Sequence, residues 1–543
     1  MEGLVETDVV VLGSGAAGLV AALAAADAGA RVAVLEKADA VGGTTALSGG
    51  VFWLPANRFG AEAGITDGRE QALAYLDALS LGLIDPAMAT TYVDSVAPLL
   101  DWLTGSAGMQ VRLVPGFPDY HPEHPGGMKD GGRSLEPGPF PMPSLGPWAE
   151  RVLRGRANPW TMIGERPRGD GSGGVDGDTI AARRRDGIEC CGRALVGWLL
   201  KACLDRGIEP MLDQPVTDLL HDENGRVTGV RAGDLVVKAR RGVIIATGGF
   251  EWDRELARDF LRGPVGHMPT ARSCTGDGLR MAMRAGAALT NMAEAWWVPT
   301  IAWGGPEAAG DDPTRHFLLL RERTLPGSIM VNRMGRRFAN EATNYNAFGA
   351  VLHEFDPVGF TYANQPCWLV FGQNFLDRYG FFGLAPGDAV PDWIARGDSV
   401  EALADVLGLP PAALADTVAR WNRMMEAGRD DDFGRGTSAY DSWNGDVQQP
   451  AGSARTLGPL DRGPFYAVPV HASTLGTKGG PKTDGDGAVL DLSGRVIPGL
   501  YAAGNAMGGV TGKVYGGAGG TLGPAMIFGW RAGRAAALSN DKN

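Results

Sequence analysis

The first segment of the chain alternates between short apolar runs and glycine turns. Val9–Leu12 is a continuous run of β-branched and leucine residues, as expected of a strand buried on both faces. Ala16–Ala28 is almost wholly small and apolar and predicts a helix, and Val32–Leu35 predicts a second strand. Strand, helix and strand follow each other so closely that they predict a βαβ unit with a parallel sheet.

Three glycines at the first strand-to-helix turn have the spacing of a dinucleotide-binding motif. In Gly13-x-Gly15-x-x-Gly18, the first glycine allows the tight turn, the second lets the backbone approach a pyrophosphate, and the third lets helix and strand pack closely. Glu36 ends the second strand, where its carboxylate can accept from a ribose hydroxyl and would repel a 2′-phosphate, which argues against NADP. This order of elements favours a dinucleotide site over an ordinary glycine turn.

A second cluster of glycines and hydroxyls decides which dinucleotide is expected. Gly42-Gly43-Thr44-Thr45 and Ser48-Gly49-Gly50 follow the acidic residue and can wrap a flavin-bearing pyrophosphate, an extension that simple nicotinamide dehydrogenases do not need. We therefore predict FAD. The residues expected to hold it are Gly13, Ser14, Gly15, Ala16, Ala17, Gly18, Glu36, Lys37, Gly43, Thr44, Thr45, Ser48, Gly49, Gly50, Val216, Ala246, Thr247, Gly248, Gly504, Asn505, Thr521 and Leu522.

The remaining periodicity predicts further helices and strands of the same domain. Helical spacing of apolar residues is found in Arg69–Leu81, Ala87–Thr104, Gly192–Arg206 and Leu279–Ala288. Strand-like segments are Glu209–Leu212, Val216–His221, Arg226–Arg231, Leu235–Ala246, Val489–Leu492 and Val496–Leu500, with a hairpin turn at residues 222–225. A final helix follows the glycine loop that begins near Val514.

The segment of about 108–187 is dense in glycine and proline and shows little periodicity. Because structureless loops of this length are uncommon unless they are functional or disordered, and because this one carries Trp148 and Trp160, we expect a lid or contact surface. The two tryptophans leave contact with a membrane open as an alternative.

Composition divides the chain into domains. Its 543 residues exceed what one hydrophobic core usually serves. The predicted fold is α/β, with a discontinuous Rossmann-like FAD-binding domain and an inserted α+β catalytic cap domain. The expected bounds are 1–288 for the first part of the FAD-binding domain, 289–460 for the cap domain and 461–543 for the second part. Within the cap, the helical segment Asp398–Ala427 should break at Pro410-Pro411.

Charge and cysteine content limit the partners and the compartment. The net charge is −12 with no polybasic run, which argues against nucleic acid as a partner. The five cysteines and seven histidines show no metal-ligand spacing, so no metal is expected. The odd number of cysteines favours a reduced, cytoplasmic compartment. Since the first strand begins almost at once, we expect no signal peptide.

Three tyrosines stand out as candidates for chemistry. Tyr120, Tyr345 and Tyr515 each lie in or beside a turn of the flavin domain or a domain junction, although a single tyrosine is more often a packing residue. Tyr515 lies in the glycine-rich segment 512–526, whose free N–H groups and following helix can hold a flavin edge or an enolate oxygen.

At this point the chain resembles a known family. Glu36, Gly42-Gly43-Thr44, Ser48-Gly49 and Ala502-Ala503-Gly504-Asn505 are similar to the fumarate reductase/succinate dehydrogenase flavoprotein superfamily, and within it the chain resembles the 3-ketosteroid Δ1-dehydrogenases. The resemblance runs from Asp8 to about Ala536. Segments that match this branch are Trp53-Leu-Pro55, Phe117-Pro-Asp-Tyr120, Gly192-Arg-Ala-Leu195, Leu475-Gly-Thr-Lys478-Gly-Gly480 and Tyr515-x-x-x-Gly519.

Departures from the reductase branch concern the substrate. Fumarate reductases are expected to carry an arginine acid in the cap, a histidine before the Thr-x-Gly-Gly turn and an arginine in the last glycine loop. This chain has Tyr345, Gly476 and Tyr515 in those regions. A dicarboxylate would be left unpaired there, at a cost of several kcal/mol, which favours a neutral ketone.

The resemblance implies a role for each catalytic candidate. Tyr515 O–H and Gly519 N–H would bind the ketone oxygen, Tyr345 would take the α proton with help from Tyr120, and the flavin would accept hydride from the β carbon. The implied reaction forms the C1–C2 double bond of a 3-ketosteroid. The alternatives are the same chemistry on a smaller cyclic ketone, a flavin-dependent ene-reductase of the fumarate or urocanate type, and a non-catalytic flavin-binding scaffold. The resemblance names no electron acceptor.

Overall fold

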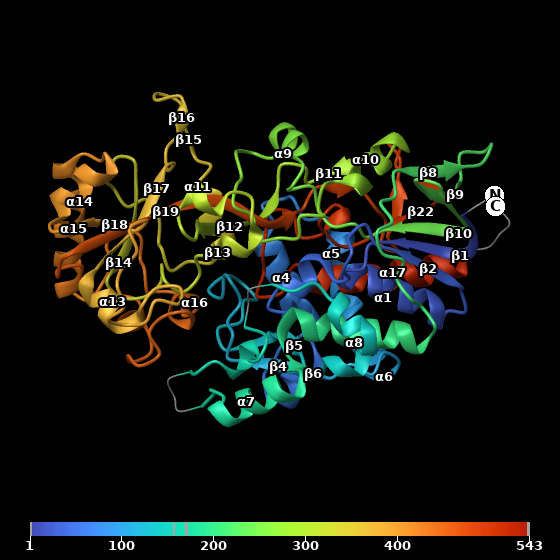
Figure 1. Cartoon of the computed structure of the whole chain (residues 1–543), viewed down its shortest axis with the longest axis horizontal. Coiled ribbons are helices and arrows are strands. Elements are labelled where there is room, and N and C mark those ends of the chain that lie inside the picture. The colour runs from blue at the N-terminus through green and yellow to red at the C-terminus, as the bar shows by residue number, and fades with distance from the viewer. Residues whose placement is uncertain (1–2, 156–157, 169–171, 540–543) are drawn as a thin grey trace.

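The computed structural model describes residues 3–155, 158–168 and 172–539. Figure 1 shows two groups of elements at opposite ends of the molecule. One contains β1, β2, β10, α1 and α17, and the other contains β14, β17 and α13–α16. The first group combines the beginning, middle and end of the chain, as expected of a discontinuous FAD-binding domain.

The sheet of this domain is mixed, with a parallel centre and antiparallel strands beside it. Its order is β2-β1-β10-β22-β21, with the hairpin β8–β9 attached to β10. The strands are β1 (Leu4–Leu12), β2 (Val32–Leu35), β8 (Asp218–His221), β9 (Val227–Ala232), β10 (Leu235–Ile245), β21 (Ala488–Leu490) and β22 (Val496–Ala502). β1 pairs in parallel with β2 and β10, and β10 pairs in parallel with β22. The sheet therefore joins segments almost 500 residues apart and confirms the predicted α/β fold.

The first and last helices of this domain pack closely. In α17 (Leu522–Leu538), a Cβ on Gly529 would lie 2.5 Å from the carbonyl oxygen of Ala17, in α1 (Ala16–Asp27). A Cβ on Gly533 would lie 2.3 Å from the carbonyl oxygen of Ala21. These distances are too short for any side chain, so the glycines of α17 set the separation of the two helices.

The other helices of the domain follow the predicted periodicity with two differences. α4 (Arg69–Ser80), α8 (Cys191–Asp205) and α10 (Asp277–Arg284) form where expected, but Ala87–Thr104 is two helices, α5 (Pro86–Asp94) and α6 (Val96–Gly105). The expected strand at Glu209–Leu212 is reduced to a single bridge between Met211 and Leu35.

The segment of about 108–187 contains more regular structure than its composition predicts. β5 (Gly131–Pro137) pairs with β4 (Val111–Pro115) and with β3 (Phe52–Trp53), and every residue of β5 is buried. Its polar residues have partners inside: Arg133 forms ion pairs with Asp67 at 2.6 Å and with Asp119 at 2.8 Å. The strand β5 is buried although it contains charged residues, so the pattern of hydrophobic positions does not predict it.

The cap domain is built on an antiparallel six-stranded sheet. Its order is β13-β12-β19-β17-β14, with β18 paired to β19. The strands are β12 (Ala295–Ala302), β13 (His316–Leu318), β14 (Ser328–Asn332), β17 (Cys367–Gly372), β18 (Ala395–Gly397) and β19 (Phe465–Thr477). The two helices α14 (Val400–Leu407) and α15 (Pro411–Glu426) are separated at Pro410-Pro411, as predicted.

The strand β19 corrects one expected boundary. The sequence predicts that residues from 461 onward belong to the second part of the FAD-binding domain, but β19 lies between β12 and β17 in the cap sheet. Its apolar composition resembles that of the strands of the other sheet, so composition alone did not separate them.

Shorter elements complete the described chain. They are α2 (Gly43–Leu47), α3 (Arg58–Glu62), β6 (Phe140–Pro141), η1 (Met142–Arg151), η2 (Ile163–Glu165), α7 (Gly177–Asp186), β7 (Ile188–Glu189), α9 (Arg254–Phe260), β11 (Leu289–Thr290), α11 (Pro306–Ala309), η3 (Pro313–Arg315), α12 (Tyr345–Val351), β15 (Phe355–Asp356), β16 (Thr361–Tyr362), α13 (Gln373–Tyr379), α16 (Ala439–Trp443), η4 (Ser453–Arg455), β20 (Gly480–Pro481) and η5 (Gly504–Ala506). None of the helices in the described ranges is long and apolar enough to cross a membrane.

Candidate active site

A cavity of about 880 Å³ brings the predicted site residues together. Its walls include Tyr120, Tyr345, Tyr515 and Gly519, together with every residue expected to hold FAD except Gly18. Lining residues come from both parts of the FAD-binding domain and from the cap domain. One continuous cavity thus connects the glycine turns with the three tyrosines.

The glycines of the first turn fit a pyrophosphate. Gly13 has φ +102°, and a Cβ there would lie 2.5 Å from the carbonyl oxygen of Ala246. A Cβ on Gly18 would lie 2.0 Å from the carbonyl oxygen of Gly13, so Gly18 serves helix–strand packing behind the cavity. At Gly15 the nearest protein atom would be the Thr45 hydroxyl at 3.4 Å. The protein alone would accept a side chain there, and the open space at Gly15 suits close approach of a phosphate group.

Glu36 lies beside the same turn. Its carboxylate accepts from the backbone N–H of Ser14 at 3.0 Å, from the Ser14 hydroxyl at 2.6 Å and from the N–H of Ala38 at 3.0 Å. The neighbouring Lys37 forms an ion pair with Asp277 at 2.6 Å. Glu36 therefore braces the turn through protein contacts, and its hydrogen bond to a ribose stays a prediction.

The second glycine and hydroxyl cluster is held in place by its own side chains. The Thr45 hydroxyl accepts from the N–H of Ala16 at 3.0 Å, and the Ser48 hydroxyl accepts from the N–H of Gly50 at 3.0 Å. These bonds tie the start of α1 to the loop that follows Glu36. The donors and turns along this wall fit the FAD that the sequence predicts.

The three tyrosines meet although they come from distant segments. Tyr120 precedes β5, Tyr345 is the first residue of α12, and Tyr515 lies in the loop before α17. The Tyr120 hydroxyl donates to the Tyr345 hydroxyl at 2.9 Å. The ring centre of Tyr515 lies 5.0 Å from that of Tyr120 and 5.4 Å from that of Tyr345. All three side chains are buried.

Burial and hydrogen bonding act in opposite directions on these phenols. Burial raises the pKa of Tyr120 and of Tyr345 well above the ordinary value of a tyrosine, although donation from Tyr120 opposes the rise at Tyr345. Burial also raises the pKa of Tyr515, against hydrogen bonds from Thr521, Tyr345 and the backbone N–H of Gly519. The Thr521 hydroxyl lies 3.2 Å from that of Tyr515. Each phenol is therefore protonated near neutral pH.

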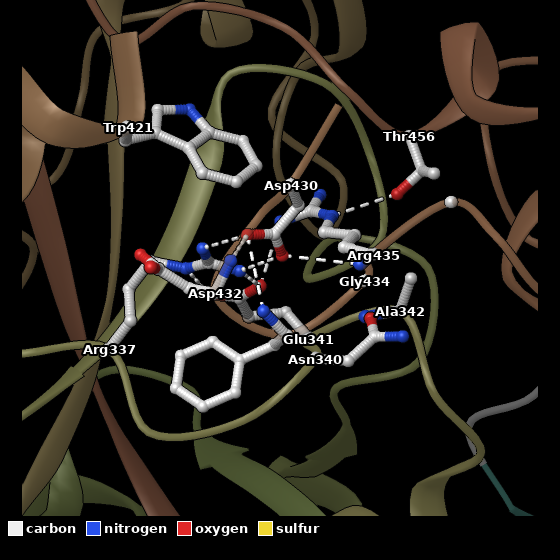
Figure 2. Close-up of polar contacts among 12 residues, drawn as sticks. Arg337, Asn340, Glu341, Ala342, Trp421, Asp430, Asp432, Gly434, Arg435 and Thr456 are labelled. Atoms are coloured by element: carbon white, nitrogen blue, oxygen red, sulfur yellow. Dashed lines mark hydrogen bonds and ion pairs between the residues drawn. The ribbon is translucent and has the colours of Figure 1, made fainter. Parts of the chain in front are cut away.

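A buried ion network, shown in Figure 2, fixes the segment that leads into Tyr345. Arg337 donates to both carboxylate oxygens of Glu341 at 2.7 Å and to Asp430 at 2.8 and 2.9 Å. Arg435 lies 3.3 Å from Glu341. Burial alone would raise the pKa of Glu341, but Arg337 and Arg435 hold it below its usual range.

The loop that carries Tyr515 is held by a buried lysine. Lys478 Nζ donates to the carbonyl oxygens of Val514 at 2.6 Å and Gly512 at 3.1 Å, and it lies 4.0 Å from the ring centre of Trp296. That ring in turn packs 4.7 Å from the ring of Tyr515. Burial lowers the pKa of Lys478 to about 7.

Several cavity residues were not predicted from the sequence. Tyr440 packs edge-on against Tyr120 with ring centres 5.0 Å apart, and Leu318, Leu320 and Arg166 also line the cavity. None of them lies in a glycine turn, the signal by which the other residues were found. Within the ranges that the structure describes, no three His, Cys, Asp or Glu side chains are grouped to hold a metal ion.

Comparison with known proteins gives closely related sequences. The model of the FAD binding domain family matches residues 8–522. A 4-oxocyclohexanecarboxylate 2-dehydrogenase of Sinomonas cyclohexanicum is 41% identical over 98% of this chain and 94% of its own length. A 3-oxosteroid 1-dehydrogenase of Mycolicibacterium smegmatis is 37% identical over 97% of this chain and 96% of its own.

Solved structures agree with these relatives. The 3-ketosteroid Δ1-dehydrogenase of Sterolibacterium denitrificans, solved in complex with 1,4-androstadiene-3,17-dione, superposes with a TM-score of 0.88 at 34% identity, covering 98% of this chain and all of the other. A flavocytochrome c3 fumarate reductase, at 24% identity and a TM-score of 0.64, shares the fold. The chain belongs to the FAD binding domain family, in the branch of the 3-ketosteroid Δ1-dehydrogenases, and is an FAD-dependent oxidoreductase.

Proposed function

We propose that this protein dehydrogenates a cyclic ketone and forms a double bond between the carbons α and β to the carbonyl group. The hydrogen bond from Tyr120 to Tyr345, beside Tyr515 and in the same cavity as the glycine turns, carries the proposal. The expected form of the reaction is formation of the C1–C2 double bond of a 3-ketosteroid, since the relatives in this branch include 3-oxosteroid 1-dehydrogenases.

The ketone oxygen binds to Tyr515 O–H and Gly519 N–H in this proposal. Both groups border the cavity, and Thr521 holds the phenol from the other side. As the α proton leaves, negative charge develops on that oxygen. Hydrogen-bond donors fixed there in advance stabilise the transition state, each contributing about 3–4 kcal/mol in comparable oxyanion sites.

The α proton is transferred to Tyr345 in its phenolate form, which becomes a neutral phenol; the phenol first loses its own proton to solvent. Burial disfavours this phenolate, and the hydrogen bond from Tyr120 opposes that effect. The bond from Tyr120 is stronger to the phenolate than to the neutral phenol, because charge-assisted hydrogen bonds are stronger than neutral ones. Bound FAD supplies the acceptor for the hydride that leaves the β carbon.

Two classes of ketone are candidates for the substrate, a steroid and a smaller single-ring ketone. Steroids are favoured by the relatives named for them and by the complex with androstadienedione. A smaller ring is favoured by the relative at 41% identity, which is named for 4-oxocyclohexanecarboxylate. Both candidates offer an acidic α position beside a ketone, so the roles of the tyrosines are the same for either.

Anaerobic reduction of the bound flavin tests the reaction. Androst-4-ene-3,17-dione or 4-oxocyclohexanecarboxylate should bleach the oxidised flavin band and yield the corresponding unsaturated ketone, identified by mass spectrometry. If no cyclic ketone bleaches the flavin, and the chemically reduced enzyme is reoxidised by fumarate or urocanate, the protein is an ene-reductase and the proposal fails.

A further inference from the structure

Arg166 faces the cavity with no partner among the described residues for its guanidinium group. It lines the cavity wall, and within the described ranges no acceptor lies within hydrogen-bond or ion-pair distance of the side chain. The nearby Arg183, by contrast, is paired with both carboxylate oxygens of Glu165, at 2.5 and 2.6 Å. The side chain of Arg166 is exposed, so its guanidinium group is solvated and available to pair with an anionic group of a ligand.

The turn that precedes Arg166 is anchored by hydrogen bonds and an ion pair. The buried carboxylate of Glu136, in β5, accepts from the N–H of Ile163 at 2.8 Å and from that of Gly164 at 2.9 Å. The next residue, Glu165, is fixed by Arg183. Arg166 directly follows this turn, η2, so its backbone is fixed on the residues before it.

Arg166 interacts electrostatically with a residue beside the tyrosine cluster. The surrounding protein lowers the pKa of Arg166 and Arg321 acts in the same direction, while Cys191, Glu136 and Glu322 oppose this effect. The positive charge of Arg166 opposes the rise that burial causes in the pKa of Tyr440, the residue that packs against Tyr120. Leu318 and Leu320 line the same cavity. The cavity therefore combines an apolar wall, the tyrosines and one unpaired cation.

We infer that Arg166 binds an anionic substituent of the substrate, so that the ketone is a cyclic keto acid whose carboxylate lies on the opposite side of the ring from Tyr515. This inference rests on the proposed function. A guanidinium group suits a carboxylate because it can donate two parallel hydrogen bonds. The expectation of a neutral ketone considered only the cationic positions of the reductases, and Arg166 lies at none of them.

Ligand binding to the oxidised holoenzyme tests the role of Arg166 without turnover. 4-Hydroxybenzoate carries a phenol in place of the enol and a carboxylate opposite to it, and 4-methylphenol lacks only the charge. Titration followed by the flavin absorbance gives both dissociation constants. Arg166→Met should weaken binding of 4-hydroxybenzoate roughly 10- to 100-fold and leave that of 4-methylphenol unchanged. Arg166→Lys should retain part of the affinity, because lysine keeps the positive charge but cannot donate two parallel hydrogen bonds to one carboxylate.

A matched control separates contact from general electrostatics. Arg321→Met removes a neighbouring positive charge that does not line the cavity, and it should change neither constant by more than about twofold. Flavin content and the circular dichroism spectrum verify that each variant is folded. The inference is overturned if 4-hydroxybenzoate does not bind the unmodified enzyme, if Arg166→Met weakens both ligands equally or neither, or if Arg321→Met has the same effect.

Turnover distinguishes this inference from the proposed function. If 4-oxocyclohexanecarboxylate and androstenedione both fail to bleach the flavin, the proposed reaction is wrong, whatever the binding constants are. If androstenedione bleaches it and Arg166→Met leaves binding of the anionic ligand unchanged, the reaction stands and the assignment of Arg166 is wrong. Support for both requires bleaching by the keto acid, with kcat/KM for the keto acid reduced in Arg166→Met by a much larger factor than kcat/KM for cyclohexanone.

Discussion

Tyr345 is the residue on which the proposed chemistry depends most. It receives a hydrogen bond from Tyr120, it lies in the cavity, and its backbone starts α12 directly after the ion network of Glu341. Tyr515 contacts the same pair, and its hydroxyl receives hydrogen bonds from Thr521, Tyr345 and the backbone N–H of Gly519. In the proposed reaction Tyr345 accepts the proton and Tyr515 donates a hydrogen bond to the ketone.

Replacing Tyr345 by phenylalanine should remove proton abstraction and leave the fold intact. The rate of flavin reduction by the ketone should fall roughly 100- to 10 000-fold, the contribution of a positioned general base, while the flavin spectrum stays unchanged. Stopped-flow absorbance measures this rate. Tyr466→Phe is the control, since it removes the hydroxyl of a buried tyrosine that bonds to Gln373 in the cap domain and does not line the cavity. Rapid reduction in Tyr345→Phe would exclude Tyr345 as the base.

Lys478 should make the folded protein more stable as the pH rises above neutral. Because burial lowers its pKa to about 7, the folded protein binds fewer protons at this site than the unfolded chain between pH 7 and the ordinary lysine pKa of about 10.4. Stability at this site therefore rises with pH across that window. From pH 7 to 9.5, the free energy of unfolding of the unmodified protein should therefore rise relative to that of Lys478→Met.

Denaturant titrations at several pH values measure that difference. The comparison with Lys478→Met cancels the other titrating groups, including the buried Glu136 and Glu251, whose pKa values burial raises to about 7. A difference that is constant with pH, or that falls as pH rises, would contradict the assigned protonation of Lys478.

At the scale of elements, the ion network of the cap domain acts as an anchor for α12. The Glu341 carboxylate accepts hydrogen bonds from Arg337 and from the N–H of Met330, in β14. One carboxylate thus links the cap sheet to the segment before Tyr345. Asp430 binds the other side of Arg337 and brings the segment after α15 into the same network. A change here should affect both stability and the position of Tyr345.

Glu341→Gln should be strongly destabilising. It leaves Arg337 and Arg435 buried with one carboxylate fewer, and breaking a buried network in this way costs about 3–5 kcal/mol of unfolding free energy. Asp101→Asn is the matched control: it breaks the exposed pair of Arg58 and Asp101, which is worth less than about 1 kcal/mol. Urea unfolding of both variants provides the comparison. Equal small losses would mean that the network does not anchor the cap.

Elements with a simple apolar pattern could be predicted from the sequence, and elements with buried charges could not. The segments β2 and α1 have continuous apolar runs and lie within one residue of their predicted bounds. The strand β1 ends where predicted but begins at Leu4, before its apolar run. The strand β5 contains Arg133 and Glu136, whose partners lie elsewhere in the chain, so its burial leaves no local signal.

For the molecule as a whole, the cavity is where residues of the FAD-binding domain and of the cap domain form one site. Its lining runs from Leu12 to Ala525 and includes cap residues such as Leu318 and Tyr440. The turns at Gly13 and Gly504 could be predicted because their glycine patterns are local. Which cap residues face them depends on long-range packing, and for that reason Tyr440 and Arg166 were found only in the structure.

This arrangement predicts that FAD stabilises the entire chain. A ligand that binds only the folded state adds RT ln(1 + [L]/Kd), about 2.7 kcal/mol at 100 times its Kd. Thermal unfolding of the apoprotein should therefore shift upward with each addition of FAD. ADP is the control, since it carries the pyrophosphate for the turn at Gly13 but no flavin to reach the cap side, so it should raise the Tm less. If ADP and FAD give equal shifts at equal saturation, or if the FAD-binding and cap domains unfold in separate transitions with only one responding to FAD, the cavity does not couple the parts that line it.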